Sequence, residues 1–159
     1  MKVILSAVLA TISLVLGGCV FPGSKLGPGD KVGDMELTTE FDINIHDLCS
    51  FDELGAGTCV IPVSVQVLGV SVGWSEDTQE ALDAAWASSK WELTIDGRPI
   101  DLDAFGTFDL DWGEKRARVW DVGLIGLTPG EHLARYEFFV DESFERGNHE
   151  QIYQFTVAP

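Results

Sequence analysis

Apolar and polar residues alternate along several short stretches of this chain. Near its end, for example, Tyr153, Phe155 and Val157 alternate with polar or small residues. Alternation of period two is typical of a β-strand that is buried on one face only. About eight such strands with turn signals between them predict a mainly β chain folded as an antiparallel β-sandwich. The predicted strands are residues 36–45, 59–68, 91–95, 98–103, 107–112, 116–125, 132–140 and 150–157.

One stretch has a different period. Between residues 75 and 89, small and apolar residues recur three and four positions apart, which is the spacing of one face of an α-helix. Asp77 and Glu80 give this stretch a start that is like a capping box, and acidic side chains stabilise the positive end of a helix dipole. We therefore expect one helix near residues 77–89, inserted in a β-sandwich domain that spans residues 35–159.

A short segment suggests which kind of sandwich this is. The segment Leu127–Gly130, with the sequence LTPG, resembles the "Leu-x-Pro-Gly" turn of fibronectin type III and related bacterial immunoglobulin-like domains. In those domains the turn precedes the penultimate strand. The resemblance implies an immunoglobulin-like sandwich. The corner tyrosine of fibronectin type III domains would fall near Leu133, so the resemblance covers the turn but not that corner.

The first 19 residues have the pattern of a secretory signal. Lys2 precedes the uncharged apolar run Val3–Leu16, which is shorter than the about 20 residues of a transmembrane helix. The next residues complete the sequence LGGC, which resembles the lipobox of bacterial lipoproteins. The resemblance implies cleavage after Gly18, so that residues 1–18 are a signal peptide, and a diacylglyceryl thioether on Cys19.

This reading predicts where the protein is located. The mature chain would be exported and anchored to the cell membrane or the outer membrane, through lipid on Cys19, with its domain on the extracytoplasmic side. Residues 19–34 would be the lipidated cysteine and a flexible tether, because Pro22–Asp34 carries glycine and proline without apolar periodicity. The formal net charge of −16 argues against a nucleic-acid partner, which would need clustered Lys and Arg.

The two remaining cysteines, Cys49 and Cys59, form an even pair in an exported chain, where disulfides persist. The segment between them contains Gly-Ala-Gly and can double back. We therefore predict a disulfide between them. The alternative is a metal site with His46 as a third ligand, which the absence of a Cys-x-x-Cys spacing makes the weaker interpretation.

The sequence contains no motif of a known catalytic site or cofactor-binding loop, so we expect neither an enzyme nor a cofactor. Four aspartates occur as two pairs of spacing two, and each pair shares a face of a predicted strand. If those strands were neighbours, the four carboxylates could bind Ca²⁺. We favour a polar face in which two arginines on the next strand neutralise one pair. The aspartates are Asp101, Asp103, Asp109 and Asp111, and the arginines are Arg116 and Arg118.

The tryptophans divide into two groups. Trp86, Trp91 and Trp120 are in phase with other apolar residues, which predicts that they lie in the core. Trp74 and Trp112 lie beside glycines at the ends of their segments and are candidates for stacking on sugar rings.

Taken together, these features predict a membrane-anchored cell-envelope lipoprotein. Its domain would bind or scaffold an unidentified envelope protein or glycan without catalysis. One alternative is a carbohydrate-binding module, which requires Trp74 and Trp112 to be exposed. Another is an unrecognised envelope hydrolase, which requires a pocket where histidine and carboxylate groups converge.

Overall fold

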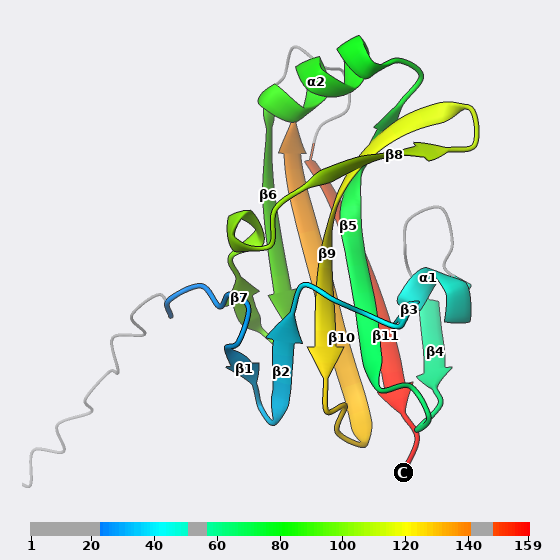
Figure 1. Cartoon of the computed structure of the whole chain (residues 1–159). Helices are drawn as coiled ribbons and strands as arrows, with labels where there is room; N and C mark the ends of the chain where they lie inside the picture. The colour runs from blue at the N-terminus through cyan, green and yellow to red at the C-terminus, as the bar shows by residue number, and fades with distance from the viewer. Residues whose placement is uncertain (1–22, 51–56, 141–147) are drawn as a thin grey trace, which may run out of the picture.

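Two β-sheets with short helices at their margins make up the fold (Figure 1). The computed structural model describes residues 23–50, 57–140 and 148–159. The predicted lipidation site, Cys19, lies outside these residues. Within the described ranges, no helix has both the length and the apolar character that a membrane span requires.

The first sheet contains β1 (Lys31–Val32), β2 (Met35–Thr38), β3 (Ile43–Asn44), β5 (Val67–Glu76), β8 (Phe108–Trp112) and β9 (Lys115–Ile125). The strand order is β1-β2-β9-β5-β3, and β8 also pairs with β9. The long antiparallel pair of β5 and β9 forms the centre of this sheet. In contrast, β3 runs parallel to β5.

The second sheet contains β4 (Gly57–Ile61), β6 (Ser89–Ile95), β7 (Arg98–Ile100), β10 (Gly130–Val140) and β11 (Asn148–Val157). Its order is β4-β11-β10-β6-β7, with β4 parallel to β11 and the other pairs antiparallel. The prediction of a mainly β chain is confirmed. The prediction of purely antiparallel sheets is wrong, because alternation shows which face of a strand is buried but not in which direction its partner runs.

The predicted helix is α2 (Gln79–Ala87), which lies across one end of both sheets (Figure 1). Its N-cap is Thr78, whose side-chain oxygen accepts a hydrogen bond from the Ala81 amide at 3.2 Å. The predicted start at Asp77 is therefore one residue early. Leu82 and Ala85 are buried, as the helical spacing predicted.

Two predicted strands end early because local structure interrupts them. The strand expected over residues 36–45 is divided into β2, which ends at Thr38, and β3, and it is followed by α1 (Ile45–Leu48), where Asn44 and Asp47 form a capping box. The strand expected over residues 98–103 stops at Ile100 and is followed by a 3₁₀-helix at Leu102–Ala104. Residues 59–68 are also divided, since β4 ends at Ile61 and β5 begins at Val67. As a result, the described residues contain eleven strands rather than about eight.

Most of the predicted tether is folded. Leu26 is buried and forms a β-bridge with Ile100, and its carbonyl accepts a hydrogen bond from the Asp101 amide at 2.8 Å. Val32 is also buried in the core. The tether expected over residues 19–34 is therefore part of the domain from Leu26 onward. Two isolated apolar residues are enough to dock this segment, although they produce no periodic pattern.

Aromatic rings connect the two sheets through the core. Trp74 of β5 packs against Phe138 of β10, with ring centroids 4.9 Å apart. Trp120 of β9 lies 5.6 Å from Trp91 of β6 and 4.5 Å from Trp86 of α2. The prediction for Trp120 is confirmed, since it is buried, while Trp86 and Trp91 are partly buried and pack against the core.

Candidate functional site

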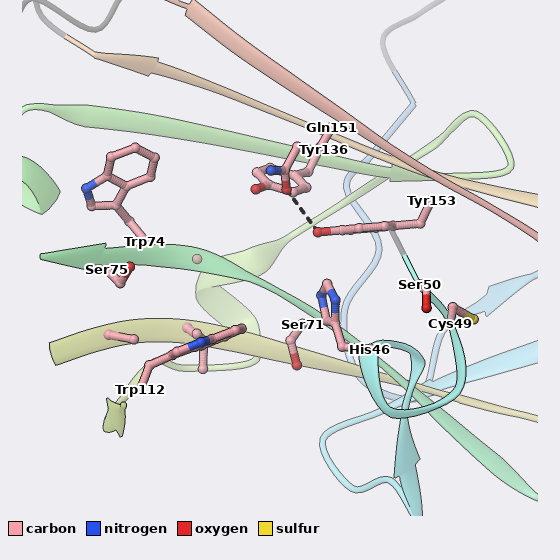
Figure 2. Close-up of a pocket in the computed structure, with 13 residues that line it drawn as sticks. His46, Cys49, Ser50, Ser71, Trp74, Ser75, Trp112, Tyr136, Gln151 and Tyr153 are labelled. Atoms are coloured by element: carbon pink, nitrogen blue, oxygen red, sulfur yellow. Dashed lines mark hydrogen bonds between the residues drawn. The ribbon is translucent and has the colours of Figure 1, made fainter. Parts of the chain in front are cut away.

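A cavity of about 560 Å³ lies along one edge of the first sheet and extends between the two sheets (Figure 2). Its walls come from α1 and the residues after it, from β5, β8 and β9, and from β10 and β11 of the opposite sheet. Both tryptophans that the sequence marked as candidates for sugar stacking, Trp74 and Trp112, contribute to it. The lining residues are His46, Cys49, Ser50, Ser71, Gly73, Trp74, Ser75, Trp112, Ala117, Val119, Tyr136, Gln151 and Tyr153.

The cavity exists because β5 and β11 are longer than the edge strands β3 and β4 that pair with them. β3 pairs with β5 only at Leu68 and Gly69, so among the described strands residues 71–76 of β5 have no partner on that side. β4 pairs with β11 only over residues 153–157. Within the described part of the chain, two unpaired strand edges therefore lie at the same side of the domain, and α1 closes the space between them at one end.

Small residues on the outer face of β5 and β9 line one side of the cavity. Because Val72 and Trp74 point into the core, Gly73 and Ser75 point the other way. A Cβ atom at Gly73 would lie 2.2 Å from the Arg118 carbonyl oxygen. Only glycine fits there without a shift of β9, and the absence of a side chain also leaves room for a ligand.

Trp112 is the most accessible aromatic side chain of the cavity, with 58% of its surface exposed. It is the last residue of β8, at the end of the β8–β9 hairpin, opposite Lys115. Trp74 differs from it, because its ring is half-buried against Phe138 and its Nε1 donates to Glu76 Oε1 at 2.7 Å. The carbohydrate-binding alternative requires both tryptophans to be exposed. Trp112 meets this requirement, and Trp74, which is half-buried, does not.

Polar groups from the second sheet line the side of the cavity on which Trp74 lies, across β5 from Trp112 (Figure 2). The Tyr153 hydroxyl donates to Gln151 Oε1 at 3.0 Å (Figure 2). Burial raises the pKa of Tyr153 to about 12 and raises that of Tyr136 further, because both hydroxyls lie in a poorly solvated place. Both tyrosines therefore carry their protons at neutral pH and can act as hydrogen-bond donors.

His46 of α1 lies at the end of the cavity nearest the disulfide. Its ring meets Tyr153 edge-on, with centroids 5.2 Å apart. Burial is the largest influence on its pKa and lowers it, although a hydrogen bond to the Ser71 backbone and the charges of Asp47 and Asp121 oppose the shift. His46 is therefore uncharged at neutral pH.

A serine, a histidine and an aspartate, the residue types of a hydrolytic triad, lie together here. The Ser71 hydroxyl donates to Asp121 and accepts from the Asn44 amide. In a triad the histidine ring would instead lie between the serine hydroxyl and the carboxylate. The hydrogen bond between His46 and Ser71 is to the backbone, so the Ser71 hydroxyl proton points to the Asp121 carboxylate and not to the histidine ring. Burial raises the pKa of Asp121 above its usual value.

Arginines on the neighbouring strand neutralise one of the two aspartate pairs. In the register of β8 and β9, Asp109 faces Arg118 and Asp111 faces Arg116, as the sequence predicted. The Asp109 carboxylate accepts from Arg118 Nε at 2.6 Å, and this hydrogen bond lowers the pKa of Asp109. Asp111 and Arg116 also form an ion pair.

The same two arginines fasten the hairpin to α2. Arg118 donates to Asp83 at 2.8 Å, and its guanidinium carbon lies 5.5 Å from the centroid of the Trp86 ring. Arg116 Nε donates to Gln79 at 3.1 Å. These contacts hold the hairpin that carries Trp112.

The arrangement required for a calcium site is absent. The calcium alternative required Asp101 and Asp103 to lie on a strand beside that of Asp109 and Asp111. They lie instead at the 3₁₀-helix, where Asp101 is the N-cap, because the chain leaves β7 after Ile100. Among the described residues, no group of three or more His, Cys, Asp or Glu side chains could hold a metal ion.

The predicted disulfide is present between Cys49 and Cys59, whose Cα atoms lie 5.4 Å apart. Cys49 is the C-cap of α1, and its amide donates to the Ile45 carbonyl at 2.9 Å. The bridge ties α1 to β4 and thereby to the second sheet. The zinc alternative is wrong, since both cysteines are oxidised.

A second, smaller cavity of about 350 Å³ lies beside Trp86, Trp91 and Trp120. Its rim carries both lysines and acids. The Trp91 indole N–H has no hydrogen-bond acceptor among the described residues. The indole ring that carries this NH group packs in the aromatic cluster, where its centroid lies 4.8 Å from that of Phe138.

His132 has a structural role away from both cavities. Its Nδ1 lies 2.8 Å from Asp96 Oδ2 and its Nε2 lies 2.8 Å from the Thr128 carbonyl. It thereby fixes the LTPG segment against the β6–β7 turn. The segment directly precedes β10, the penultimate strand of the chain.

Comparisons with known proteins find similarity at the level of solved structures. No family model matches the chain, and no curated protein matches it. It is similar to the crystal structure of EhICP2, a cysteine protease inhibitor from Entamoeba histolytica, with 9% identity and a TM-score of 0.37 over 67% of this chain and 90% of that one. It is also similar to PbICP-C in its complex with falcipain-2, with 15% identity and a TM-score of 0.35 over 85% and 99%.

The sequence indicated Trp74 and Trp112 but missed the second wall of the site. Nothing in the pattern distinguishes Tyr136 and Tyr153 from other inward-facing residues of their strands. Gln151 and Ser75 resemble any polar strand residue. Their shared location depends on which strand edges stay open, and that is a property of the assembled sheets.

Proposed function

We propose that this protein is an exported, lipid-anchored envelope protein whose β domain binds a ligand without catalysis. The observation that carries the binding proposal is the cavity at the open edge of β5. Its volume lies within the roughly 300–1,000 Å³ of small-molecule sites, and it combines aromatic walls with a few polar groups. The hydroxyl of Ser71 donates to the Asp121 carboxylate and not to the His46 ring, so the arrangement of a serine–histidine–aspartate triad does not support the hydrolase alternative.

The proposed domain type is an immunoglobulin-like sandwich. In such domains four strands in the order A-B-E-D pack on a sheet with the order G-F-C, and some members add C′. The orders β3-β5-β9-β8 and β11-β10-β6-β7 correspond to these two sheets. Trp91 on β6 would then take the place of the core tryptophan of strand C. β1 and β2 are additions at the N-terminus.

Lipid anchoring rests on residues 16–19 and is compatible with the disulfide, because disulfides persist outside the cytosol. The test is mass spectrometry of the mature chain together with detergent phase partitioning. The wild-type protein should begin at an acylated Cys19 and enter the detergent phase. Cys19→Ser should remove the acyl mass and leave the chain uncleaved. An unmodified wild-type chain in the aqueous phase would contradict the anchor.

Ligand binding can be tested by photo-crosslinking in the native cells. Benzoylphenylalanine would replace Ser50, an exposed residue at the rim of the cavity, and the matched control would replace Leu133, which is 39% exposed on the outer face of the second sheet. We expect a covalent adduct at position 50 and none at position 133. If both positions give the same adducts, or neither gives one, the cavity is not a binding site.

A further inference from the structure

The part of β5 that lines the cavity has an open edge. Among the described strands, its partner on that side, β3, pairs only with Leu68 and Gly69. The Val67 carbonyl accepts a hydrogen bond from the Asp42 amide at 3.1 Å, so it points to this side. Residues two apart in a strand direct their backbone groups to the same edge. The backbone groups of residues 69, 71, 73 and 75 therefore point to the open edge as well.

Gly73 and Ser75 provide the unpaired backbone groups of this edge. Each has one N–H donor and one C=O acceptor, and no described strand pairs with them on this side. The Ser71 backbone, which lies nearer to β3, is hydrogen-bonded to His46. A partner that offers N–H and C=O groups at the spacing of a strand is another extended chain.

This edge also lacks the residues that keep strand edges from pairing. Charged side chains and proline have that effect. Several other outer strands carry them: Lys31 in β1, Arg98 and Pro99 in β7, and Asp109 and Asp111 in β8. Residues 71–75 of β5, with the sequence SVGWS, contain neither a charge nor a proline. The open edge of β5 is therefore suited to accept a further strand.

The cavity extends to both sides of this edge (Figure 2). Trp112, which is 58% exposed, lies on the outer side of β5, whereas Tyr136, Gln151 and Tyr153 lie on the side of the second sheet. Successive side chains of a strand point to opposite faces. A strand added at the open edge would therefore direct its side chains alternately toward these two walls.

The lining restricts which side chains such a strand can carry. Charged residues make up 23% of the chain, but none is among the thirteen described residues that line the cavity. A charged side chain would enter this space without a countercharge, which is unfavourable. The strand that fits is uncharged. A second copy of this chain fits less well, because each copy has a formal net charge of −16 and the two would repel each other.

We propose that the open edge of β5 binds an extended, uncharged segment of another protein, which adds to the first sheet as a further strand. The backbone of the segment pairs with Gly73 and Ser75, and its side chains pack alternately toward Trp112 and into the space between the sheets. Backbone pairing supplies the affinity, and the two walls select against charge. This inference rests on the proposed function, since it names the partner class of the same cavity.

The test uses the full mature protein in detergent micelles and a library of capped heptapeptides that contain apolar, polar and charged residues. Bound peptides are identified by mass spectrometry, and the affinity of the tightest one is measured by calorimetry. We expect the bound peptides to be uncharged at consecutive central positions. N-methylation of alternate backbone amides keeps the side chains but removes the donors on one edge. One of the two alternating patterns should weaken binding at least about tenfold, because it blocks pairing with β5.

Two variants of Ser75 separate the backbone from the side chain. Ser75→Pro removes the N–H group at the open edge and should weaken binding of the tightest peptide at least about tenfold. Ser75→Ala keeps this N–H group and removes only the hydroxyl, so its affinity should stay within about twofold of wild type. Proline is tolerated where the N–H group faces away from the sheet, and thermal melting should show that both variants fold. If Ser75→Pro does not fold, the N-methylated peptides still test the backbone pairing on the wild-type protein.

Three results would overturn the proposed strand: no bound peptide, equal binding of charged and uncharged peptides, or full affinity for both N-methylated patterns. A crosslinked product made only of this chain would also overturn it, because the occupant would then be a second copy. The crosslinking at position 50 separates this failure from failure of the proposed function. A specific adduct without peptide binding would keep the cavity as a binding site and reject the strand. No specific adduct and no peptide binding would reject both.

Discussion

Loss of the disulfide should destabilise the domain by an amount that follows from its position. Cys49 and Cys59 are 10 residues apart, and chain-entropy theory gives about 2.7 kcal/mol at 25 °C for a loop of that length. The mechanism is the greater freedom of the unfolded chain once the loop is opened. The folded state should change little, because α1 retains its capping box and the amide of Cys49 still donates to Ile45.

The assay is urea unfolding followed by tryptophan fluorescence, with and without a phosphine reductant. For a slope of about 2 kcal/mol per molar urea, the midpoint should fall by about 1.3 M. A melting experiment should show a loss of about 5–10 °C. Cys49→Ala combined with Cys59→Ala should reproduce the reduced protein, since alanine adds no buried hydroxyl. The near-ultraviolet circular dichroism of the folded forms should agree.

Two results would refute this reasoning. If oxidised and reduced proteins unfold within about 0.5 kcal/mol of each other, the bridge does not restrict the unfolded chain as the theory requires. If the folded, non-reduced protein contains titratable thiols at Cys49 and Cys59, the bridge itself is absent.

Two further predictions concern residues around the cavity. Gly73→Ala should destabilise the domain by about 1–3 kcal/mol in urea unfolding, because its Cβ would lie 2.2 Å from the Arg118 carbonyl oxygen. Gly23→Ala, which meets no atom within 4 Å, is the control, and equal effects would contradict the packing argument. The wild-type protein should lose stability as the pH falls below 6.5, because the lowered pKa of His46 lets the unfolded chain take up a proton that the folded chain refuses. His46→Gln should reduce that slope in unfolding curves measured at several pH values, and an unchanged slope would show that His46 is not the group responsible.

The sequence predicted those features that depend on local pattern. Alternation correctly placed Tyr153, Phe155 and Val157 on the buried face of their strand. The number of cysteines predicted the disulfide, because lipid on Cys19 would leave a single possible pair. Aspartates and arginines at matching spacing predicted the ion pairs of the β8–β9 hairpin. Each of these features can be predicted from residues that are close together in the sequence or joined by one turn.

Some local signals were present in the sequence, but the interpretation gave more weight to the periodic pattern around them. Residues 36–45 alternate like a strand, yet Asn44 and Asp47 contain the capping box that starts α1. Within the segment expected to be a tether, Leu26 and Val32 were the apolar residues that dock it. A few apolar or capping residues can decide a short element, whereas periodic patterns reveal only longer ones.

The sequence by itself determined which face of each long strand is buried, since side chains alternate with a period of two whatever the partner strand is. Only the tertiary structure decided which strands are neighbours, in which direction they run, and where their edges stay open. Among the described strands, the short partners β3 and β4 leave parts of β5 and β11 unpaired at the same side of the domain. That arrangement brings Trp112, Gln151 and Tyr153 to one cavity, because strand pairing joins residues that are far apart in the chain.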